Sequence, residues 1–293
     1  MKKASIIGGG EIGRAIASLL ALKGIAVSIW DKDPSISQGG EEKDVLKDAE
    51  AVFFCVPSWC LRDALASAKE FLFGNEVLVF VSKGLEKKTG LSSLEITSAV
   101  APLYSSVFIG GPMIAEEISS GKGGAGVVAS DNPISAEKIR EAISSPLFDA
   151  TIGDDPRGVV FSGVLKNVYA MLLGASEGLG YGVNIRGWLV SEILTEMAEV
   201  VAVLGGDKKT PYGPAGLGDL IATGSGPFSS NWKAGFSLAS GHHPEKVSEG
   251  MSSFDEIHRR LGDISRFRFM SAIGDIMAGL DPKTVFKGIL SSK

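Results

Sequence analysis

The stretch Ala4-Ser5-Ile6-Ile7-Gly8-Gly9-Gly10-Glu11-Ile12-Gly13 decides the fold of this chain. It runs from a short apolar strand into a G-x-G-x-x-G turn, after which apolar residues recur at helical spacing. In such a turn Gly8 permits the tight bend, Gly10 lets the backbone approach a pyrophosphate, and Gly13 permits close packing of helix on strand. The amides at the helix N-terminus then face the phosphates. The stretch therefore predicts a strand-turn-helix unit that binds a dinucleotide.

A carboxylate follows the second expected strand, Ala26–Trp30. This residue is Asp31, which lies about 20 residues past the glycine turn, where an acidic side chain binds the ribose 2′-hydroxyl of a dinucleotide. Because a carboxylate repels the 2′-phosphate of NADP, Asp31 favours NAD, although the neighbouring Lys32 can partly offset the repulsion. We therefore expect NAD as the cofactor and keep NADP as the alternative.

Four further apolar segments are typical of strands of the same sheet, and the strand signals stop at about Asp155. These strands are expected at Ala51–Val56, Val77–Val81, Ser106–Ile109 and Ala125–Ala129. Two long helical patterns follow, Arg157–Tyr181 and Asn184–Leu204. The predicted fold class is therefore α/β followed by all-α, with a Rossmann-type doubly wound sheet in residues 1–154 and a helical substrate domain in residues 155–293.

The composition excludes several classes of partner. The 293-residue chain has a formal net charge of -5 with acids and bases mixed along it, so it offers no basic stripe for nucleic acid and no polybasic membrane patch. No apolar run is expected to be long enough to span a bilayer. The two cysteines, Cys55 and Cys60, support neither a disulfide framework nor a metal site. We expect a small-molecule substrate, no metal and a reducing cytoplasm.

Histidine is not the expected proton donor if the protein is an enzyme, because His242, His243 and His258 lie in polar surroundings typical of a protein surface. The alternative is Lys166, which lies with Asn167 in an otherwise apolar helical stretch. Such a lysine either is desolvated inside a site or snorkels its stem along apolar surface. A desolvated lysine has its pKa lowered towards neutrality, which suits proton transfer.

Two other polar residues have both a structural and a functional interpretation. Lys83 either lies at the sheet edge where open α/β sheets bind their ligands, or is a lysine in a surface loop. Asp219 begins a helix within the glycine-rich stretch Gly213–Thr223, and an aspartate in that position is commonly a cap. The local sequence leaves both alternatives open.

Several short motifs occur in a recognisable order from the first strand to the last helices. They are the glycine turn, Ser82-Lys83-Gly84, Gly111-Pro112 with Ala115-Glu116, Gly163–Asn167, Gly178–Gly182 with Asn184, Gly216–Leu220 with Thr223, and Ser248–Met251. In this order the chain resembles the NAD(P)-dependent glycerol-3-phosphate dehydrogenases. The resemblance implies hydride transfer between nicotinamide and C2 of glycerol 3-phosphate or dihydroxyacetone phosphate.

The resemblance also implies the functional residues. Lys166 is the expected general acid/base, and Asp219 accompanies it in the catalytic site. The substrate-binding residues implied are Lys83, Asn167, Thr223 and Asn231. The cofactor-binding residues expected from the glycine turn, the strand ends and the family motifs are Gly8, Gly10, Glu11, Ile12, Gly13, Asp31, Pro57, Lys83 and Ala115.

The chain departs from the family where the substrate phosphate is bound. Ser230 lies where the family carries an arginine that grips the phosphate, and Glu192 replaces a second arginine. Neutral groups bind phosphate less well than a bidentate guanidinium does. Either Lys233 or Arg186 supplies the contact, or the substrate is not the usual phosphate ester. The crossover from Asp31 to Val45 is also short.

Three functions remain after these observations. The first is a glycerol-3-phosphate dehydrogenase with an altered phosphate clamp, and the second is a related two-domain dehydrogenase for another small hydroxy or keto compound. The third is a nicotinamide-binding sensor without turnover, against which a buried Lys166 argues because binding NAD alone does not require it. The wide apolar faces of the helical domain permit a homodimer.

Overall fold

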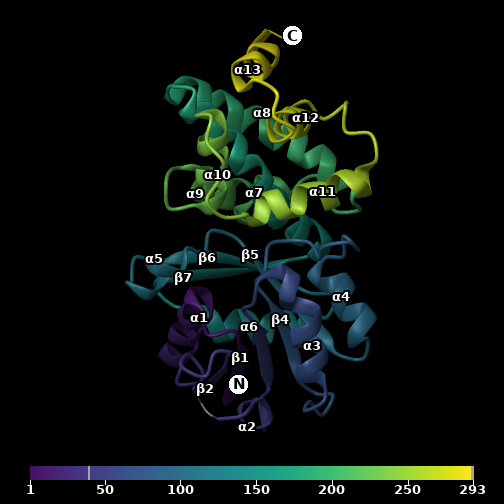
Figure 1. The fold of residues 1–293 in the computed structure, drawn as a ribbon. Coiled ribbons are helices and arrows are strands. Elements are labelled where there is room, and N and C mark those ends of the chain that lie inside the picture. The colour runs from purple at the N-terminus through teal and green to yellow at the C-terminus, as the bar shows by residue number, and fades with distance from the viewer. Residues whose placement is uncertain (39, 292–293) are drawn as a thin grey trace. The chain divides into compact units, whose positions relative to one another are not determined.

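The chain divides into two compact units in the computed structural model, which describes residues 1–38 and 40–291 (Figure 1). The first unit is Met1–Ser82 with Leu91–Val160, and the second is Lys83–Gly90 with Phe161–Lys293. The short segment Lys83–Gly90 thus belongs to the second unit, although the chain on either side of it belongs to the first. The functional domain boundary after residue 154 stays a prediction.

The first unit is built on a seven-stranded sheet with the strand order β2-β1-β3-β4-β5-β6-β7. The strands are β1 Lys3–Ile7, β2 Ala26–Trp30, β3 Ala51–Phe54, β4 Val77–Phe80, β5 Ser105–Gly110, β6 Gly124–Ala129 and β7 Phe148–Gly153. Neighbouring strands pair in parallel except β5 and β6, which are antiparallel. β3 and β4 are buried over their whole length, as expected of parallel strands covered on both faces. The predicted Rossmann-type fold class is confirmed.

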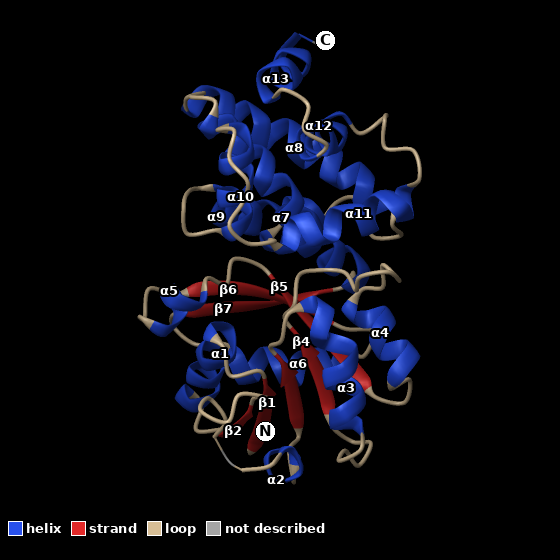
Figure 2. Ribbon diagram, viewed as in Figure 1, coloured by secondary structure: helices blue, strands red, loops and turns tan. Residues whose placement is uncertain are grey.

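Helices flank the sheet in two groups (Figure 2). One group contains α1 Glu11–Leu22, α5 Ala115–Ser119 and α6 Pro133–Ile143, and α1 contacts both of its partners. The other contains α2 Glu42–Leu46, α3 Leu61–Lys69, which follows the 3₁₀ turn η1 Ser58–Cys60, and α4 Ser93–Val100. The layers are those of a doubly wound domain.

The sequence patterns do not predict β7 or α4. Residues of β7 alternate between buried and exposed at the edge of the sheet, so no continuous apolar run marks this strand. The signal for α4 was present, because Ser92 and Glu95 form a capping box in which each side chain accepts a hydrogen bond from the other residue's backbone amide.

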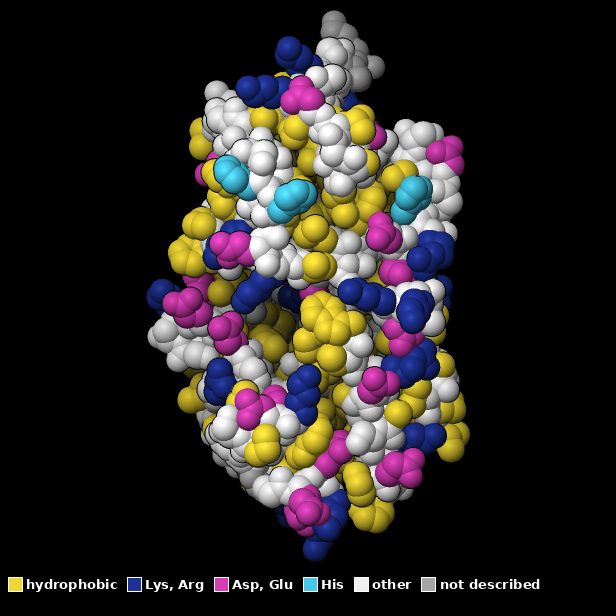
Figure 3. All heavy atoms as spheres, in the orientation of Figure 1, with side chains coloured by type: hydrophobic (Ala, Val, Ile, Leu, Met, Phe, Trp, Pro, Cys, Tyr) yellow, Lys and Arg dark blue, Asp and Glu magenta, His cyan; other side chains and the backbone are white. Residues whose placement is uncertain are grey.

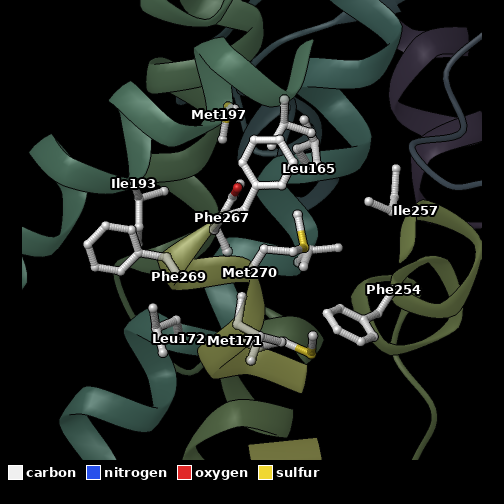
Figure 4. Close-up of a cluster of buried hydrophobic side chains, with 14 of the residues drawn as sticks. Leu165, Met171, Leu172, Ile193, Met197, Phe254, Ile257, Phe267, Phe269 and Met270 are labelled. Carbon is white, nitrogen blue, oxygen red and sulfur yellow. The ribbon is translucent and has the colours of Figure 1, made fainter. Parts of the chain in front are cut away.

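The elements described in the second unit are all helical. They are α7 Pro156–Gly178, α8 Val183–Val203, the short helices η2 Thr210–Tyr212 and η3 Pro214–Gly218, α9 Asp219–Gly224, α10 Ser230–Ala239, α11 Glu249–Leu261, α12 Arg268–Met277 and α13 Pro282–Ser291. The first of them, α7, begins in the first unit, which extends to Val160. The two long helices are those that the apolar spacing predicts. Side chains from α7, α8, α11 and α12 form one buried hydrophobic cluster (Figure 4).

The helix α7 is the central element of the second unit. Every residue from Gly158 to Ser176 is buried. By length and composition alone α7 could cross a membrane, so the expectation that no apolar run is long enough was wrong. The apolar stretch of α7 is wholly buried inside the protein, however, and its composition is therefore that of a core helix.

Two glycines allow α7 and α10 to approach each other at backbone distance. A Cβ atom at Gly174 would lie 2.1 Å from the carbonyl oxygen of Trp232, and one at Gly235 would lie 1.8 Å from the carbonyl oxygen of Met171. Neither carbonyl can move without moving a helix. The contact between the two helices therefore depends on hydrogen atoms at both positions.

Replacing Gly174 by alanine should destabilise the protein by about 1 to 3 kcal/mol or more, because the added methyl group forces the two helices apart. Gly187→Ala is the matched control within α8, where an added Cβ would meet no atom within 4 Å in the part of the chain that the structure describes. The control should be neutral or stabilising by about 0.5 to 1 kcal/mol, since alanine favours the helix over glycine. Urea unfolding measures both changes, and equal effects of the two variants would contradict the packing described here.

Candidate active site

The glycine turn and the ends of neighbouring strands border a pocket of 510 Å³ in the first unit. Four of the predicted cofactor residues line it: Gly8, Gly10, Asp31 and Pro57. The remaining lining residues are Trp30, Lys32, Cys55, Val56, Trp59, Cys60, Asp63, Ala64 and Ser67. A pocket of this size, mostly walled by apolar side chains with a few carboxylates, is suited to part of a dinucleotide.

The three glycines of the turn have different surroundings. Gly8 has a φ of +100°, and a Cβ there would lie 2.8 Å from the carbonyl oxygen of Cys55. A Cβ at Gly13 would lie 2.0 Å from the carbonyl oxygen of Gly8, so α1 packs directly on the turn. Among the described residues nothing lies within 4 Å of the Cβ position of Gly10, the residue before α1. The open space at this helix N-terminus fits the pyrophosphate of a dinucleotide.

Asp31 is held in place at the end of β2. One carboxylate oxygen accepts a hydrogen bond from the backbone amide of Gly9 at 2.7 Å, and the other accepts one from the amide of Asp33 at 3.0 Å. The carboxylate therefore enters the pocket in a fixed orientation with lone pairs left for a further donor.

Four other predicted cofactor residues are not among those that line this pocket: Glu11, Ile12, Gly13 and Ala115. Glu11 is exposed in the first turn of α1, while Ile12 and Ala115 pack against the hydrophobic core of the first unit. Lys83 belongs to the second unit. Contacts of these residues with a cofactor stay predictions.

A cluster of charged residues is buried in the second unit. The Nζ atom of Lys83 lies 2.6 Å from one carboxylate oxygen of Asp219, and the Nζ atom of Lys166 lies 3.1 Å from the other. Lys166 also donates a hydrogen bond of 2.6 Å to the hydroxyl of Thr223, which in turn donates one of 3.2 Å to Asp219. Lys166 is 7% exposed and Asp219 is 3% exposed. The structure thus brings together four residues that the sequence predicts.

The local sequence around α9 explains how Asp219 reaches the lysines. A π-helical turn, Pro214–Gly218, leads into α9, and a Cβ at Gly216 would lie 2.2 Å from the carbonyl oxygen of Pro211. Asp219 and Thr223 are four residues apart and therefore share one face of the helix. The carboxylate of Asp219 makes no capping hydrogen bond, because Gly218 is the N-cap residue. Asp219 is therefore not a helix cap but a member of an ion-paired cluster, and its catalytic role stays a prediction.

Two buried amides connect the same cluster to its surroundings. Asn167 donates to the backbone carbonyl of Lys83, and Asn231 donates to the side-chain oxygen of Asn167, both at 2.8 Å. The side-chain oxygen of Asn231 accepts from the backbone amide of Gly250, also at 2.8 Å. Each amide nitrogen and each amide oxygen of the pair therefore has a partner within the protein.

Burial and neighbouring charges set the proton affinities of the cluster. Burial lowers the pKa of Lys166 to about 8, an effect that Asp219 opposes and the ammonium of Lys83 reinforces. Burial alone would raise the pKa of Asp219, but the charges of Lys166 and Lys83 outweigh burial and hold that pKa below its ordinary value. At neutral pH the cluster therefore contains an ionised aspartate and a lysine that can exchange its proton.

The remaining polar residues singled out in the sequence lie at the surface or near it. All three histidines are exposed (Figure 3). Ser230 is the first residue of α10 and is exposed, as is Lys233 one turn later. Arg186 on α8 lies 3.8 Å from the carboxylate of Glu177.

Sequence reasoning missed the contribution of α11. Glu249, its first residue, raises the pKa of Lys166 through its charge, and a Cβ at the next residue, Gly250, would lie 2.5 Å from the carbonyl oxygen of Asn167. The Ser248–Met251 motif was a signal for this proximity, but nothing in the motif itself indicates which helix it meets.

Comparison with known proteins agrees with this geometry. Residues 35–136 match the family described as NAD-dependent glycerol-3-phosphate dehydrogenase N-terminus, and residues 155–286 match the corresponding C-terminus. The chain belongs to the NAD-dependent glycerol-3-phosphate dehydrogenase family. The second match contains Lys166, Asp219, Thr223 and Asn231.

Individual members of the glycerol-3-phosphate dehydrogenase family align with nearly the whole chain. The glycerol-3-phosphate dehydrogenase (NAD(P)+) of Gloeobacter violaceus is 34% identical over 289 residues, which cover 96% of this chain and 93% of the relative. That of Nitratidesulfovibrio vulgaris is 31% identical and covers 99% and 98%. The crystal structure of glycerol-3-phosphate dehydrogenase from Coxiella burnetii superposes with a TM-score of 0.89 at 26% identity, covering 99% of both chains.

Proposed function

We propose that this protein is an NAD(P)-dependent oxidoreductase that interconverts glycerol 3-phosphate and dihydroxyacetone phosphate, with Lys166 as the general acid/base. The buried cluster of Lys83, Asp219, Lys166 and Thr223 carries this proposal, because it places an exchangeable proton in a desolvated site. Family membership supports the choice of reaction over the two alternatives, another hydroxy or keto substrate and a sensor without turnover.

The chemistry of ketone reduction assigns a task to each group in the cluster. The nicotinamide cofactor, when bound, supplies the hydride that adds to C2 of dihydroxyacetone phosphate. Negative charge then develops on the carbonyl oxygen, and protonated Lys166 stabilises this charge and donates its proton to the oxygen. In the reverse direction neutral Lys166 accepts the hydroxyl proton of glycerol 3-phosphate.

The neighbours of Lys166 orient it and compensate its charge. The hydroxyl of Thr223 accepts a hydrogen bond from one N–H group of the Lys166 ammonium. The other two N–H groups are left for Asp219 and the substrate oxygen. Asp219 keeps the two lysines close together although their charges repel.

Three further features of the protein are part of the proposal. The fixed carboxylate of Asp31 favours NAD over NADP, since it would repel a 2′-phosphate. We also propose that the enzyme works in the cytoplasm, and that it forms a homodimer through apolar side chains that are exposed in the single chain, such as Val183 and Phe228.

Oxidation of NADH with dihydroxyacetone phosphate as substrate tests the reaction directly. The unaltered protein should turn over, whereas Lys166→Met should lower kcat by about a hundredfold to ten-thousandfold, because the proton donor is lost. NADH binding, followed by its fluorescence, should be the same in both proteins. A Lys166→Met variant with near-normal turnover would show that another group transfers the proton.

The two directions of the reaction should respond oppositely to pH. A pKa of about 8 means that Lys166 is mostly protonated below pH 8 and mostly neutral above it. For ketone reduction, kcat/KM should therefore fall by about tenfold per pH unit above the pKa, and for alcohol oxidation it should fall likewise below the pKa. Initial rates measured between about pH 7 and pH 10 check this. A bend that lies far from pH 8 in both profiles would contradict the role of Lys166.

Ser230→Arg should lower KM for dihydroxyacetone phosphate by about tenfold, because a guanidinium adds charge-assisted hydrogen bonds to a phosphate. Unphosphorylated dihydroxyacetone should show no such gain. Ser240→Arg is the matched control, since it adds the same charge at an exposed position at the other end of α10. If KM does not change in Ser230→Arg, another group already binds the phosphate.

A further inference from the structure

The segment Lys83–Gly90 is held by the helix α11. The backbone amide of Leu85 donates a hydrogen bond of 3.2 Å to the hydroxyl of Ser253, and the amide of Lys88 donates one of 2.9 Å to the carboxylate of Glu256. Both side chains are buried, with Ser253 0% exposed and Glu256 4% exposed. Backbone groups of the segment thus find their partners on side chains of one helix.

The contacts come from a single face of α11. Ser253 and Glu256 lie three residues apart and are therefore neighbours on the helix surface. Phe254 and Ile257 belong instead to the hydrophobic cluster of the second unit. The apolar side chains of α11 thus build the core, to which Leu85 of the segment also belongs, while the buried polar face formed by Ser253 and Glu256 holds the backbone of Lys83–Gly90.

The N-terminal end of α11 is linked to Lys83 by a chain of hydrogen bonds. The amide of Gly250 donates to Asn231, Asn231 donates to Asn167, and Asn167 donates to the carbonyl of Lys83. The three hydrogen bonds all measure 2.8 Å and run in one direction from α11 to the segment. The backbone of Lys83 is therefore anchored at its own carbonyl and again two residues later at Leu85.

Burying the carboxylate of Glu256 costs free energy, which its ion pair with Arg259 and its hydrogen bond from the amide of Lys88 offset. The residue of the segment whose position matters most for the charged cluster is Lys83, because its ammonium contacts Asp219 at 2.6 Å. We propose that the buried polar face of α11, together with the Asn167–Asn231 pair, positions Lys83 against Asp219. Ser253 and Glu256 are therefore positioning residues for the proton transfer. The kinetic consequence alone rests on the proposed function.

Displacement of Lys83 has a measurable effect on Lys166. The charged groups that act on Lys166 are Asp219 on α9, Lys83 on the segment and Glu249 on α11. If Lys83 moves away, Lys166 loses a like charge and Asp219 loses a competing cation. Both changes favour the protonated form of Lys166, so its pKa rises.

The experiment is a titration of Lys166 by NMR on protein labelled at the lysine ε-carbons, without substrate or cofactor. Lys83→Met removes the ammonium altogether and should raise the pKa of Lys166 by about one unit, which is the largest rise that displacement of Lys83 can cause. Ser253→Ala and Glu256→Ala should each produce part of that rise. Glu256→Gln keeps an oxygen that can accept the hydrogen bond from the amide of Lys88, so the pKa of Lys166 should stay close to that of the unaltered protein.

Two controls separate positioning from loss of stability. Asn132→Ala removes the N-cap of α6 in the first unit and should destabilise the protein without moving the pKa of Lys166. Ser253→Ala added to Lys83→Met should cause no further rise, because the positioned charge is already absent. An unchanged pKa in Ser253→Ala overturns the proposal even if Glu256→Ala does not fold, and so does a further rise in the double variant.

The kinetic arm distinguishes this proposal from the proposed function. In Ser253→Ala and Glu256→Ala the pH above which kcat/KM for ketone reduction falls should be higher than in the unaltered protein, by the same amount as the pKa measured by NMR. If the unaltered protein does not reduce dihydroxyacetone phosphate, the proposed function fails, while the titration still decides whether α11 positions Lys83. If the pKa of Lys166 rises while the pH dependence of kcat/KM does not change, the charge of Lys83 has no part in the reaction.

Discussion

The ion-paired carboxylate of Asp219 is the interaction on which the second unit depends. Removing an ammonium or a carboxylate from water costs several kcal/mol for each ion unless partners compensate it. Lys166 lies in the buried part of α7, where it pairs with the carboxylate of Asp219 and donates a hydrogen bond to the neutral acceptor Thr223. Without Asp219 the core would contain two ammonium groups that have lost the carboxylate lying between them.

Three elements supply the members of this cluster, and each reaches its place by a different physical device. α7 is fixed by backbone contact with α10 at Gly174 and Gly235, where any side chain would intrude. α9 is set by the π-helical turn that precedes it. The segment Lys83–Gly90 has no regular structure of its own and is placed by side chains of α11. The placement of the site therefore depends on contacts between helices that lie far apart in the sequence.

The sequence predicts the parts of the fold that repeat a local signal. The glycine turn, the continuous apolar strands and the two long helices are of this kind. The local sequence left open whether Lys166 is desolvated or snorkels along apolar surface, and the structure shows that it is buried. The edge strand β7 lacks the apolar run of a buried strand. Asp219 could not be assigned because a cap and an ion-pair partner look alike locally, and its partner Lys83 is 136 residues away. Ser253 and Glu256 resemble the solvated face of an amphipathic helix, and sequence spacing does not reveal whether water or backbone meets that face.

Opposing effects place the pKa of Lys166 close to the pH of a cell. Burial and the charge of Lys83 lower its pKa, whereas Asp219 and Glu249 raise it, and the outcome is about 8. A lysine with an ordinary pKa would hold its proton too firmly to accept and release it in turn, and one that was merely buried would lack its charge at neutral pH. Because the histidines are exposed, the chain has no buried imidazole to fill this role. The position of Lys83 therefore matters in addition to the burial of Lys166, which has the larger effect, since both adjust the same equilibrium.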